Sequence, residues 1–157
     1  MYRGGHNRPL ARGCAMILTG RSLVGGTVEG EALVSAVTIS GWGGVDPMTG
    51  TIIETRHPLK GVSFAGKILV FLGAKGSSGW SVAFHTTRLA GVAPAGLIFT
   101  AMSTKAALGA LVLRVPAITD FDSDPLTMIA TGDQLRVDGD RGTVEILSRA
   151  NDIGRAA

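Results

Sequence analysis

The chain has 157 residues, the length of one ordinary domain, and its content of 45% hydrophobic and 17% charged residues argues against wholesale disorder. The net charge of +3 resides at the start of the chain, where four arginines precede the first acidic residue, Glu29: Arg3, Arg8, Arg12 and Arg21. The rest of the chain is close to neutral and lacks the basic cluster and stacking aromatics that are typical of nucleic-acid binding.

The single cysteine, Cys14, excludes an internal disulfide framework and a self-contained cysteine metal site. We therefore predict that this chain binds no metal, and a lone thiol favours a reducing, cytoplasmic setting. The apolar run CAMIL is too short for the core of a signal peptide, and no stretch approaches the roughly 18 apolar residues of a membrane span.

The first part of the chain predicts strands followed by a long loop. Residues 1–13 lack apolar periodicity, and we expect a flexible basic arm there. Strands are predicted over 14–20 and 26–35. Turn signals then crowd residues 40–61, and so long a loop is usually functional or disordered. The short apolar TII inside it predicts a small anchoring strand.

Strands and helices alternate in the middle of the chain. The predicted order is a buried strand over 66–74, a helix of about 14 residues from near Ser77 or Ser78, a strand over 94–101, a helix over 103–114 and a strand over 115–121. Ser103 is predicted as the N-cap of the second helix. This order implies right-handed crossovers in an α/β fold with a mostly parallel central sheet.

The last part of the chain predicts a brief helix and a hairpin. Asp124 suits a helix cap, and Pro125 suits the first helical position. Residues 133–138 and 142–147 predict the hairpin, an antiparallel addition to the sheet. We expect residues 148–157 to form a loose C-terminal tail.

The stretch LGAKGSSGW between the strand over 66–74 and the following helix allows three interpretations. A phosphate-binding P-loop requires a lysine after the last glycine, but Lys75 precedes Gly76. Ser77 or Ser78 could simply cap the helix, a contribution of about 1 kcal/mol. Alternatively, a serine hydroxyl at a helix N-terminus could act as a nucleophile or a base, because its alkoxide would be stabilised there.

The histidines do not decide between the last two interpretations. His6 lies in the predicted arm, and His85 lies about two helical turns beyond Ser77. His57 lies in the long loop and could meet the serine, although most such histidines are ordinary turn residues. From the residues alone, the stretch is an anion-friendly turn with a candidate serine.

Several motifs together resemble the small, swivelling-domain subunit of the aconitase X family. They are the segment GWGGVDPMTGTII followed by His57-Pro58, then Gly66-Lys67 and the turn GAKGSS ending at Ser78. AGVAPAGLIF, ALGALV, VPAI and ATGDQLRVDGDRGTVEI fit as well, so the resemblance spans roughly residues 17–147. It implies an aconitase-type swivelling β/β/α domain, which we place at residues 14–147.

The resemblance implies a dehydratase that is inactive as this chain alone. In the family, a large subunit binds an iron–sulfur cluster and the small subunit supplies a serine base, which corresponds to Ser77. The implied partner is therefore a large aconitase X subunit, in a heterodimer or a higher assembly, and the substrate is a small hydroxy acid. One cysteine cannot hold such a cluster, so the cluster is expected on the large subunit.

Further site residues are expected around Ser77. Gly76 should leave room for the substrate, and Lys75 should add positive potential. Ser78 should mostly supply its backbone N–H group and cap the helix. Arg56 and His57 are expected to face the substrate, where Arg56 could hold a carboxylate. The partner interface is expected at the loop around Trp42, with the following residues: Trp42, Gly43, Gly44 and Asp46.

The resemblance alone does not identify the substrate. Archaeal members, which dehydrate mevalonate 5-phosphate, tend to read KGST at the turn where this chain reads KGSS at residues 75–78. The difference favours the bacterial branch, which dehydrates cis-3-hydroxy-L-proline to Δ1-pyrroline-2-carboxylate. The alternatives are the small subunit of a mevalonate 5-phosphate dehydratase and a non-catalytic binding domain that has kept the swivel fold.

Overall fold

The computed structural model describes residues 16–153, so the predicted arm and Cys14 lie outside the described residues. Its strands are β1 (Met16–Thr19), β2 (Arg21–Val24), β3 (Thr27–Ser35), β4 (Ile39–Ser40), β5 (Val45–Asp46), β6 (Thr51–Ile52), β7 (Ile68–Phe71), β8 (Ala74–Lys75), β9 (Gly96–Phe99), β10 (Ala117–Thr119), β11 (Gln134–Asp138) and β12 (Thr143–Ser148). Its helices are α1 (Trp80–Leu89), α2 (Thr104–Leu113), α3 (Pro125–Met128) and α4 (Ala150–Ile153). Within the described range, no helix is long and apolar enough to cross a membrane.

Eight strands form one mixed sheet in the order β1-β12-β11-β3-β7-β9-β10-β2. Strands β3, β7, β9 and β10 run parallel to their neighbours within this block. Antiparallel strands extend the block on both sides, with β11, β12 and β1 on one side and β2 on the other. The predicted parallel centre with antiparallel additions is thereby confirmed, although the sequence analysis missed β2.

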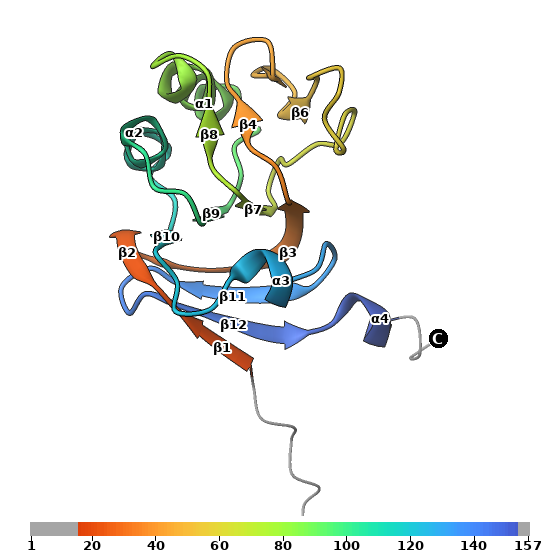
Figure 1. The fold of residues 1–157 in the computed structure, drawn as a ribbon, viewed down its shortest axis with the longest axis vertical. Coiled ribbons are helices and arrows are strands. Elements are labelled where there is room, and N and C mark those ends of the chain that lie inside the picture. Colours follow the sequence, from red (N-terminus) through yellow and green to blue (C-terminus); the bar gives the residue numbers. More distant parts are fainter. Residues whose placement is uncertain (1–15, 154–157) are drawn as a thin grey trace, which may run out of the picture.

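The sheet rolls up because its two outermost strands are consecutive in the chain. β1 and β2 stand at opposite ends of the strand order, yet only Gly20 separates them. Figure 1 shows them as one ribbon that crosses in front of the other strands. The N–H of Gly20 donates to the carbonyl of Gly142 over 2.8 Å, which ties the crossing point to the turn between β11 and β12.

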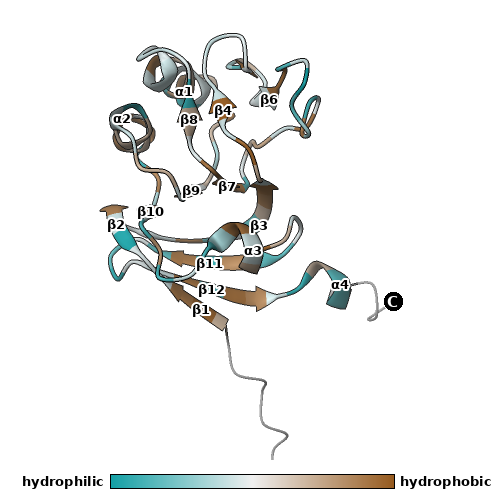
Figure 2. Cartoon of the chain, in the orientation of Figure 1, coloured by the Kyte–Doolittle hydropathy of each residue, from teal (hydrophilic) through white to brown (hydrophobic). Residues whose placement is uncertain are grey.

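Apolar side chains fill two cores on opposite faces of the sheet. In β7, Ile68 and Val70 belong to one core, whereas Leu69 and Phe71 belong to the other. This alternation is the period of two expected for a strand that is buried on both faces. Figure 2 shows the corresponding strands as hydrophobic ribbons in the middle of the molecule. The buried strand predicted over 66–74 is thus confirmed in its central part.

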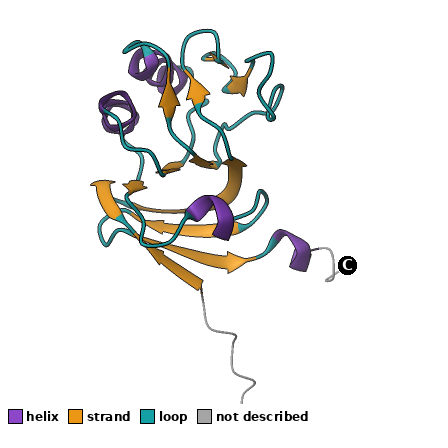
Figure 3. Cartoon of the chain, viewed as in Figure 1, coloured by secondary structure: helices purple, strands orange, loops and turns teal. Residues whose placement is uncertain are grey.

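The core that holds Leu69 and Phe71 is covered by the helices α1 and α2, which lie together at one end of the molecule (Figure 3). Trp80, at the start of α1, is 1% exposed, and its ring stacks on Phe84 with centroids 4.0 Å apart. Its indole N–H donates to the carbonyl of Ile39 over 2.9 Å. Trp80 therefore anchors the first turn of α1 to the strand β4.

Helix caps agree with the sequence at two helices and differ at the third. The hydroxyl of Ser103 accepts from the N–H of Ala106, and the carboxylate of Asp124 accepts from the N–H of Leu126, as predicted. Helix α1, however, begins at Trp80, and its N-cap is Gly79, which makes no side-chain capping bond. Ser77 and Ser78 therefore lie before the helix, so the interpretation of the turn as a simple serine cap does not hold, and the expectation that Ser78 caps the helix is wrong.

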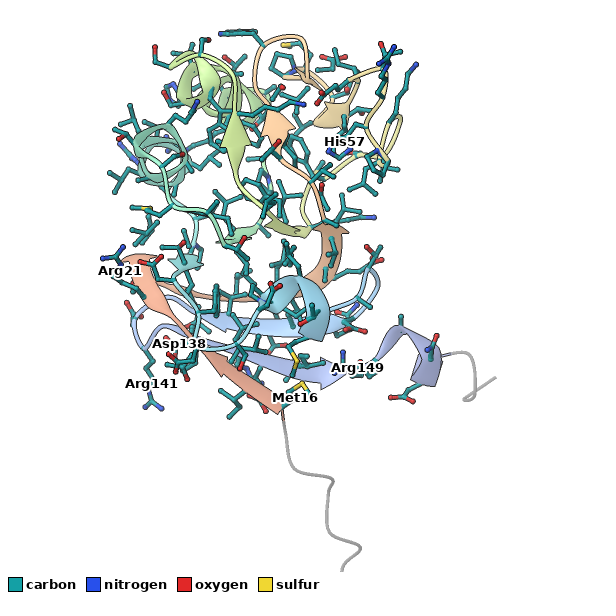
Figure 4. All side chains as sticks on the ribbon, in the orientation of Figure 1. Met16, Arg21, His57, Asp138, Arg141 and Arg149 are labelled. Carbon is teal, nitrogen blue, oxygen red and sulfur yellow. The ribbon has the colours of Figure 1, made fainter. Side chains whose placement is uncertain are left out.

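The predicted loose tail is ordered over its first six residues. Strand β12 runs to Ser148, and α4 follows at Ala150–Ile153. Asp133, which is 1% exposed, accepts hydrogen bonds from the side chain of Arg149 over 2.9 Å and from the N–H of Ala150 over 3.0 Å. Figure 4 shows Arg149 beside Met16, whose sulfur atom lies 3.4 Å from an Arg149 nitrogen.

Candidate active site

The serine turn lies where two parallel strands end. After β7, the chain forms the two-residue strand β8, which pairs in parallel with β4, and then turns through residues 76–79 into α1. The N–H of Ala101, just beyond β9, donates to the carbonyl of Leu72 over 2.7 Å, so both strand ends meet at this edge. Ligands of parallel sheets bind at this kind of edge, beyond the carboxyl ends of the strands.

Ser77 is exposed, and its hydroxyl lies at the positive end of α1. The N–H of Gly79 donates to Ser77 Oγ over 3.3 Å, a bond that would strengthen if the oxygen carried a negative charge. Among the described residues, the N–H groups of Ser77 and Ser78 donate to no protein acceptor. No acidic residue occupies the first turn of α1. The turn can therefore stabilise an anion at or beside Ser77.

Gly76 gives the turn its shape. Its φ of +96° lies in the region that favours glycine, and a Cβ at this position would meet nothing within 4 Å. The open space agrees with the expectation that this residue leaves room for a substrate. Its carbonyl accepts from the ammonium of Lys105 over 2.5 Å, so the first turn of α2 holds the peptide that precedes Ser77.

Trp42 brings the loop around residues 41–46 against this turn. A Cβ added to Gly79 would lie 2.8 Å from Cδ1 of Trp42, so only a glycine permits this approach. The Trp42 side chain is nevertheless 54% exposed. Gly43 is exposed as well, but Gly44 is buried, and half-buried Asp46 accepts from the N–H of Met48 over 2.9 Å. Of these four candidate interface residues, Trp42 and Gly43 are exposed.

Lys75 makes an ion pair that the sequence did not predict. Its Nζ lies 2.5 Å from Oε1 of Glu54, which lies in the long loop just after β6. Glu54 and Lys105 are the two residues near the turn that sequence reasoning missed. Their partners lie 21 and 29 residues away along the chain, so no local pattern could reveal either contact.

The expectation that His57 faces the substrate is corrected by its burial. His57 is 6% exposed and lies inside the long loop (Figure 4). Its Nδ1 accepts from the N–H of Leu59 over 3.0 Å, so the neutral ring carries its proton on Nε2, which lies 3.2 Å from the hydroxyl of Ser35. Desolvation by burial lowers the pKa of His57 and keeps the ring neutral.

Arg56, the neighbour of His57, is exposed and forms no salt bridge with another described residue. A guanidinium in this state is available to an anion, as the sequence suggested, but no side chain between residues 16 and 153 holds it by a hydrogen bond or an ion pair. A surface hollow of about 380 Å³ opens on the other side of the turn, between Ser78 and the start of α2. Ser103, Thr104, Lys105 and Leu108 complete its lining.

The described residues offer no place for an iron–sulfur cluster. No group of three or more His, Cys, Asp or Glu side chains between residues 16 and 153 is arranged to hold a metal ion. The chemistry that the site itself can provide is therefore that of a serine hydroxyl, backbone N–H groups and lysine ammonium groups.

Comparisons with known proteins agree with this architecture. Residues 17–146 match the family model described as the aconitase X swivel domain. The chain is 39% identical over 131 residues to the phosphomevalonate dehydratase small subunit of Methanocella arvoryzae, covering 83% of this chain and 99% of that protein. It is 40% identical over 132 residues to the protein of that name from Thermococcus kodakarensis, covering 84% and 97%.

Solved structures agree with the fold. The crystal structure of Thermococcus kodakaraensis aconitase X in its holo-form superposes with a TM-score of 0.80 at 39% identity, covering 85% of this chain and 99% of that chain. The solution structure of a UPF0107 protein gives a TM-score of 0.77 at 38% identity, covering 85% and 100%. The family match over most of the chain and these likenesses lead to one conclusion: this chain belongs to the aconitase X swivel domain family.

Proposed function

We propose that this chain is the small subunit of a two-chain dehydratase that acts on mevalonate 5-phosphate. The support is the name that its relatives share, phosphomevalonate dehydratase small subunit, at 39% and 40% identity over nearly their whole length. A small subunit implies a large one, so the chain alone is inactive. The preference for hydroxyproline rests on one side chain, Ser78, and the named relatives lend it no support.

Ser77 is the general base in this proposal. Mevalonate 5-phosphate carries a proton on the carbon next to its carboxylate and a hydroxyl on the following carbon. The Ser77 oxygen, as the alkoxide, takes that proton, the electron pair of the C–H bond forms a carbon–carbon double bond, and the hydroxyl leaves as hydroxide. The proton held by Ser77 then balances the departing hydroxide, so that one water forms and the alkoxide is restored. The single observation that carries this role is the exposed Ser77 hydroxyl, which accepts from the N–H of Gly79 at the positive end of α1.

The substrate is a multiply charged anion, with a carboxylate and a phosphate of about −1.5 to −2 charge at pH 7. The N–H groups of Ser77 and Ser78, together with Lys105 and with Lys75 in its pair with Glu54, provide donors for such an anion at this turn. We infer that the iron–sulfur cluster implied by the family resemblance belongs to the large subunit, because the described residues of this chain do not suit it.

The test is to combine the chain with its large subunit and to assay the pair separately with mevalonate 5-phosphate and with cis-3-hydroxy-L-proline. We expect the pair to form an unsaturated phosphorylated acid from the first substrate and to leave the second unchanged. Turnover of hydroxyproline alone would move the chain to the bacterial branch. An inactive pair with a fully loaded large subunit would favour a binding domain. Turnover by this chain without a partner would contradict the two-subunit proposal.

A further inference from the structure

The ion pair between Glu54 and Lys75 joins the long loop to the serine turn. Glu54 Oε1 lies 2.5 Å from the ammonium of Lys75, the second residue before Ser77. The backbone of Glu54 is fixed in turn, since its N–H and that of Ile53 both donate to the carbonyl of Gly44. The carboxylate that pairs with Lys75 therefore belongs to a residue whose backbone is held in place by a hydrogen bond.

The second oxygen of the same carboxylate is the unusual feature. Glu54 Oε2 is buried and has no hydrogen-bond partner among the described residues, and it is the only buried side-chain oxygen or nitrogen of that part of the chain in this condition. A buried, unpaired carboxylate oxygen costs stability. The ion pair compensates little, because 47% of the Lys75 side chain is exposed to solvent. Stability alone therefore does not explain a glutamate at this position.

We propose that Glu54 is a positioning residue of the serine turn and acts through Lys75. A lysine side chain is a flexible stem with three N–H donors at its end. Glu54 engages one donor and restricts the stem, so the ammonium is held at the start of the turn and its other donors are available to an incoming substrate anion. On the other side of the turn, Lys105 holds the carbonyl of Gly76, so a lysine flanks the turn on each side.

This inference rests on the proposed function, in which the turn supplies the base, and it predicts different kinetic effects for substitutions of Glu54 and of Lys75. In the assembled enzyme, Glu54→Gln leaves the charge of Lys75 uncompensated but mobile. We expect KM for mevalonate 5-phosphate to stay unchanged or to fall, and kcat to drop by about 10- to 100-fold through loss of orientation. Lys75→Met removes the charge itself, and KM should rise.

The decisive measurement is the double variant Glu54→Gln/Lys75→Met, together with each single variant. Because Glu54 acts through Lys75, the double variant should match Lys75→Met within about twofold in kcat/KM. Losses that multiply would overturn the inference, as would a Glu54→Gln enzyme with wild-type kcat. A lower melting temperature of Glu54→Gln together with wild-type kcat per folded enzyme would assign Glu54 to structure alone and would also overturn it.

Glu145 provides the matched control. Glu145 lies on β12, away from the serine turn, and its side chain pairs with that of Arg136 over 3.0 Å. The Glu145 side chain is 30% exposed, close to the 25% of Glu54. Glu145→Gln should leave kcat and KM unchanged. Ser77→Ala separates the two proposals: wild-type turnover by that variant would reject the proposed function. An inactive Ser77→Ala enzyme, combined with multiplying losses at Glu54 and Lys75, would reject only this inference.

Discussion

At the scale of single residues, Ser77 is the residue on which turnover should depend. Loss of a general base typically costs about 10²–10⁴ in rate, so Ser77→Ala should reduce kcat of the assembled enzyme by that order. Because Gly79 and not Ser77 caps α1, and because Ser77 is exposed, the melting temperature of the chain should not change. Steady-state kinetics and thermal unfolding of the same preparation check both statements.

Ser78→Ala is the control for that experiment. Ser78 is also exposed and precedes the cap, and the backbone N–H that it offers survives the substitution. We expect a change in kcat of less than about threefold and an unchanged melting temperature, since neutral surface substitutions change stability by less than about 0.5 kcal/mol. A Ser78→Ala enzyme as inactive as Ser77→Ala would show that the loss of turnover is not specific to the hydroxyl of Ser77.

His57 should make stability depend on pH in a defined direction. Burial lowers the pKa of His57 below its ordinary value of 6.5, with Glu54 opposing this shift and Lys75 adding to it. Between the lowered value and 6.5 the unfolded chain binds more protons than the folded chain, so the free energy of unfolding rises with pH. The stability at neutral pH is therefore lost progressively as the pH falls below about 6.5.

The substitution His57→Asn tests this pH dependence. Asparagine keeps an acceptor for the N–H of Leu59 but has no proton to titrate in this range. Urea unfolding of wild type and variant at several pH values between about 7.5 and 5 measures the slope in each. The variant should be less stable at neutral pH and should lose less stability on acidification. Equal slopes would show that His57 does not contribute.

At the scale of elements, we expect the short helix α4 to contribute to the stability of the domain. Asp133 is buried, and it accepts hydrogen bonds from Ala130, Arg149 and Ala150. A chain that ends at Ser148 loses the last two donors and leaves a buried carboxylate poorly satisfied, at a cost of about 1–3 kcal/mol. Urea unfolding of this truncated chain should therefore show a lower midpoint than wild type.

A chain that ends at Ile153 is the control for the truncation, because it keeps Arg149 and Ala150. It should unfold at the wild-type midpoint. If the chain ending at Ser148 also unfolds there, the contacts of Asp133 with α4 contribute nothing to stability, and the tail over 148–157 behaves as the sequence suggested.

Comparison of the sequence with the structure shows which elements a local pattern can reveal. The continuous apolar run of β7 and the caps Ser103 and Asp124 are local features, and the sequence predicted them correctly. Strand β8 has two residues, and its partner β4 lies 35 residues earlier, so no periodicity marks it. The cap of α1 is Gly79, and Trp42 packs against that glycine, a contact that only the tertiary fold reveals.

The same limit applied to the candidate site. The family resemblance selects Ser77, since the residues alone exclude a P-loop but leave a helix cap and a reactive serine open. The sequence places His57 toward the substrate because it is a polar group in the long loop, beside the turn that Pro58 fixes, and it shows no partner for the ring. The structure supplies that partner in Ser35, 22 residues earlier. Residues such as Glu54, which act through contacts between distant segments, stay hidden until those segments are placed together.

At the scale of the whole molecule, the exposed Trp42 should form part of the surface that binds the large subunit. A tryptophan that is 54% exposed beside the candidate catalytic turn would be buried by a partner that completes the site. Central tryptophans of interfaces typically cost at least about 2 kcal/mol when truncated. Trp42→Ala should therefore weaken association of the two subunits by about 30-fold or more in Kd.

Calorimetric titrations of the large subunit, one with the wild-type chain and one with the Trp42→Ala chain, measure this difference in Kd. The melting temperature of each isolated small subunit shows whether the variant folds. Leu89→Ala is the matched control, because Leu89 is 73% exposed at the far end of α1 from the serine turn. It should leave the Kd at the wild-type value. If the folded Trp42→Ala chain binds as tightly as wild type, the loop around Trp42 lies outside the interface, and the large subunit must approach Ser77 from the side of α2 and Lys105.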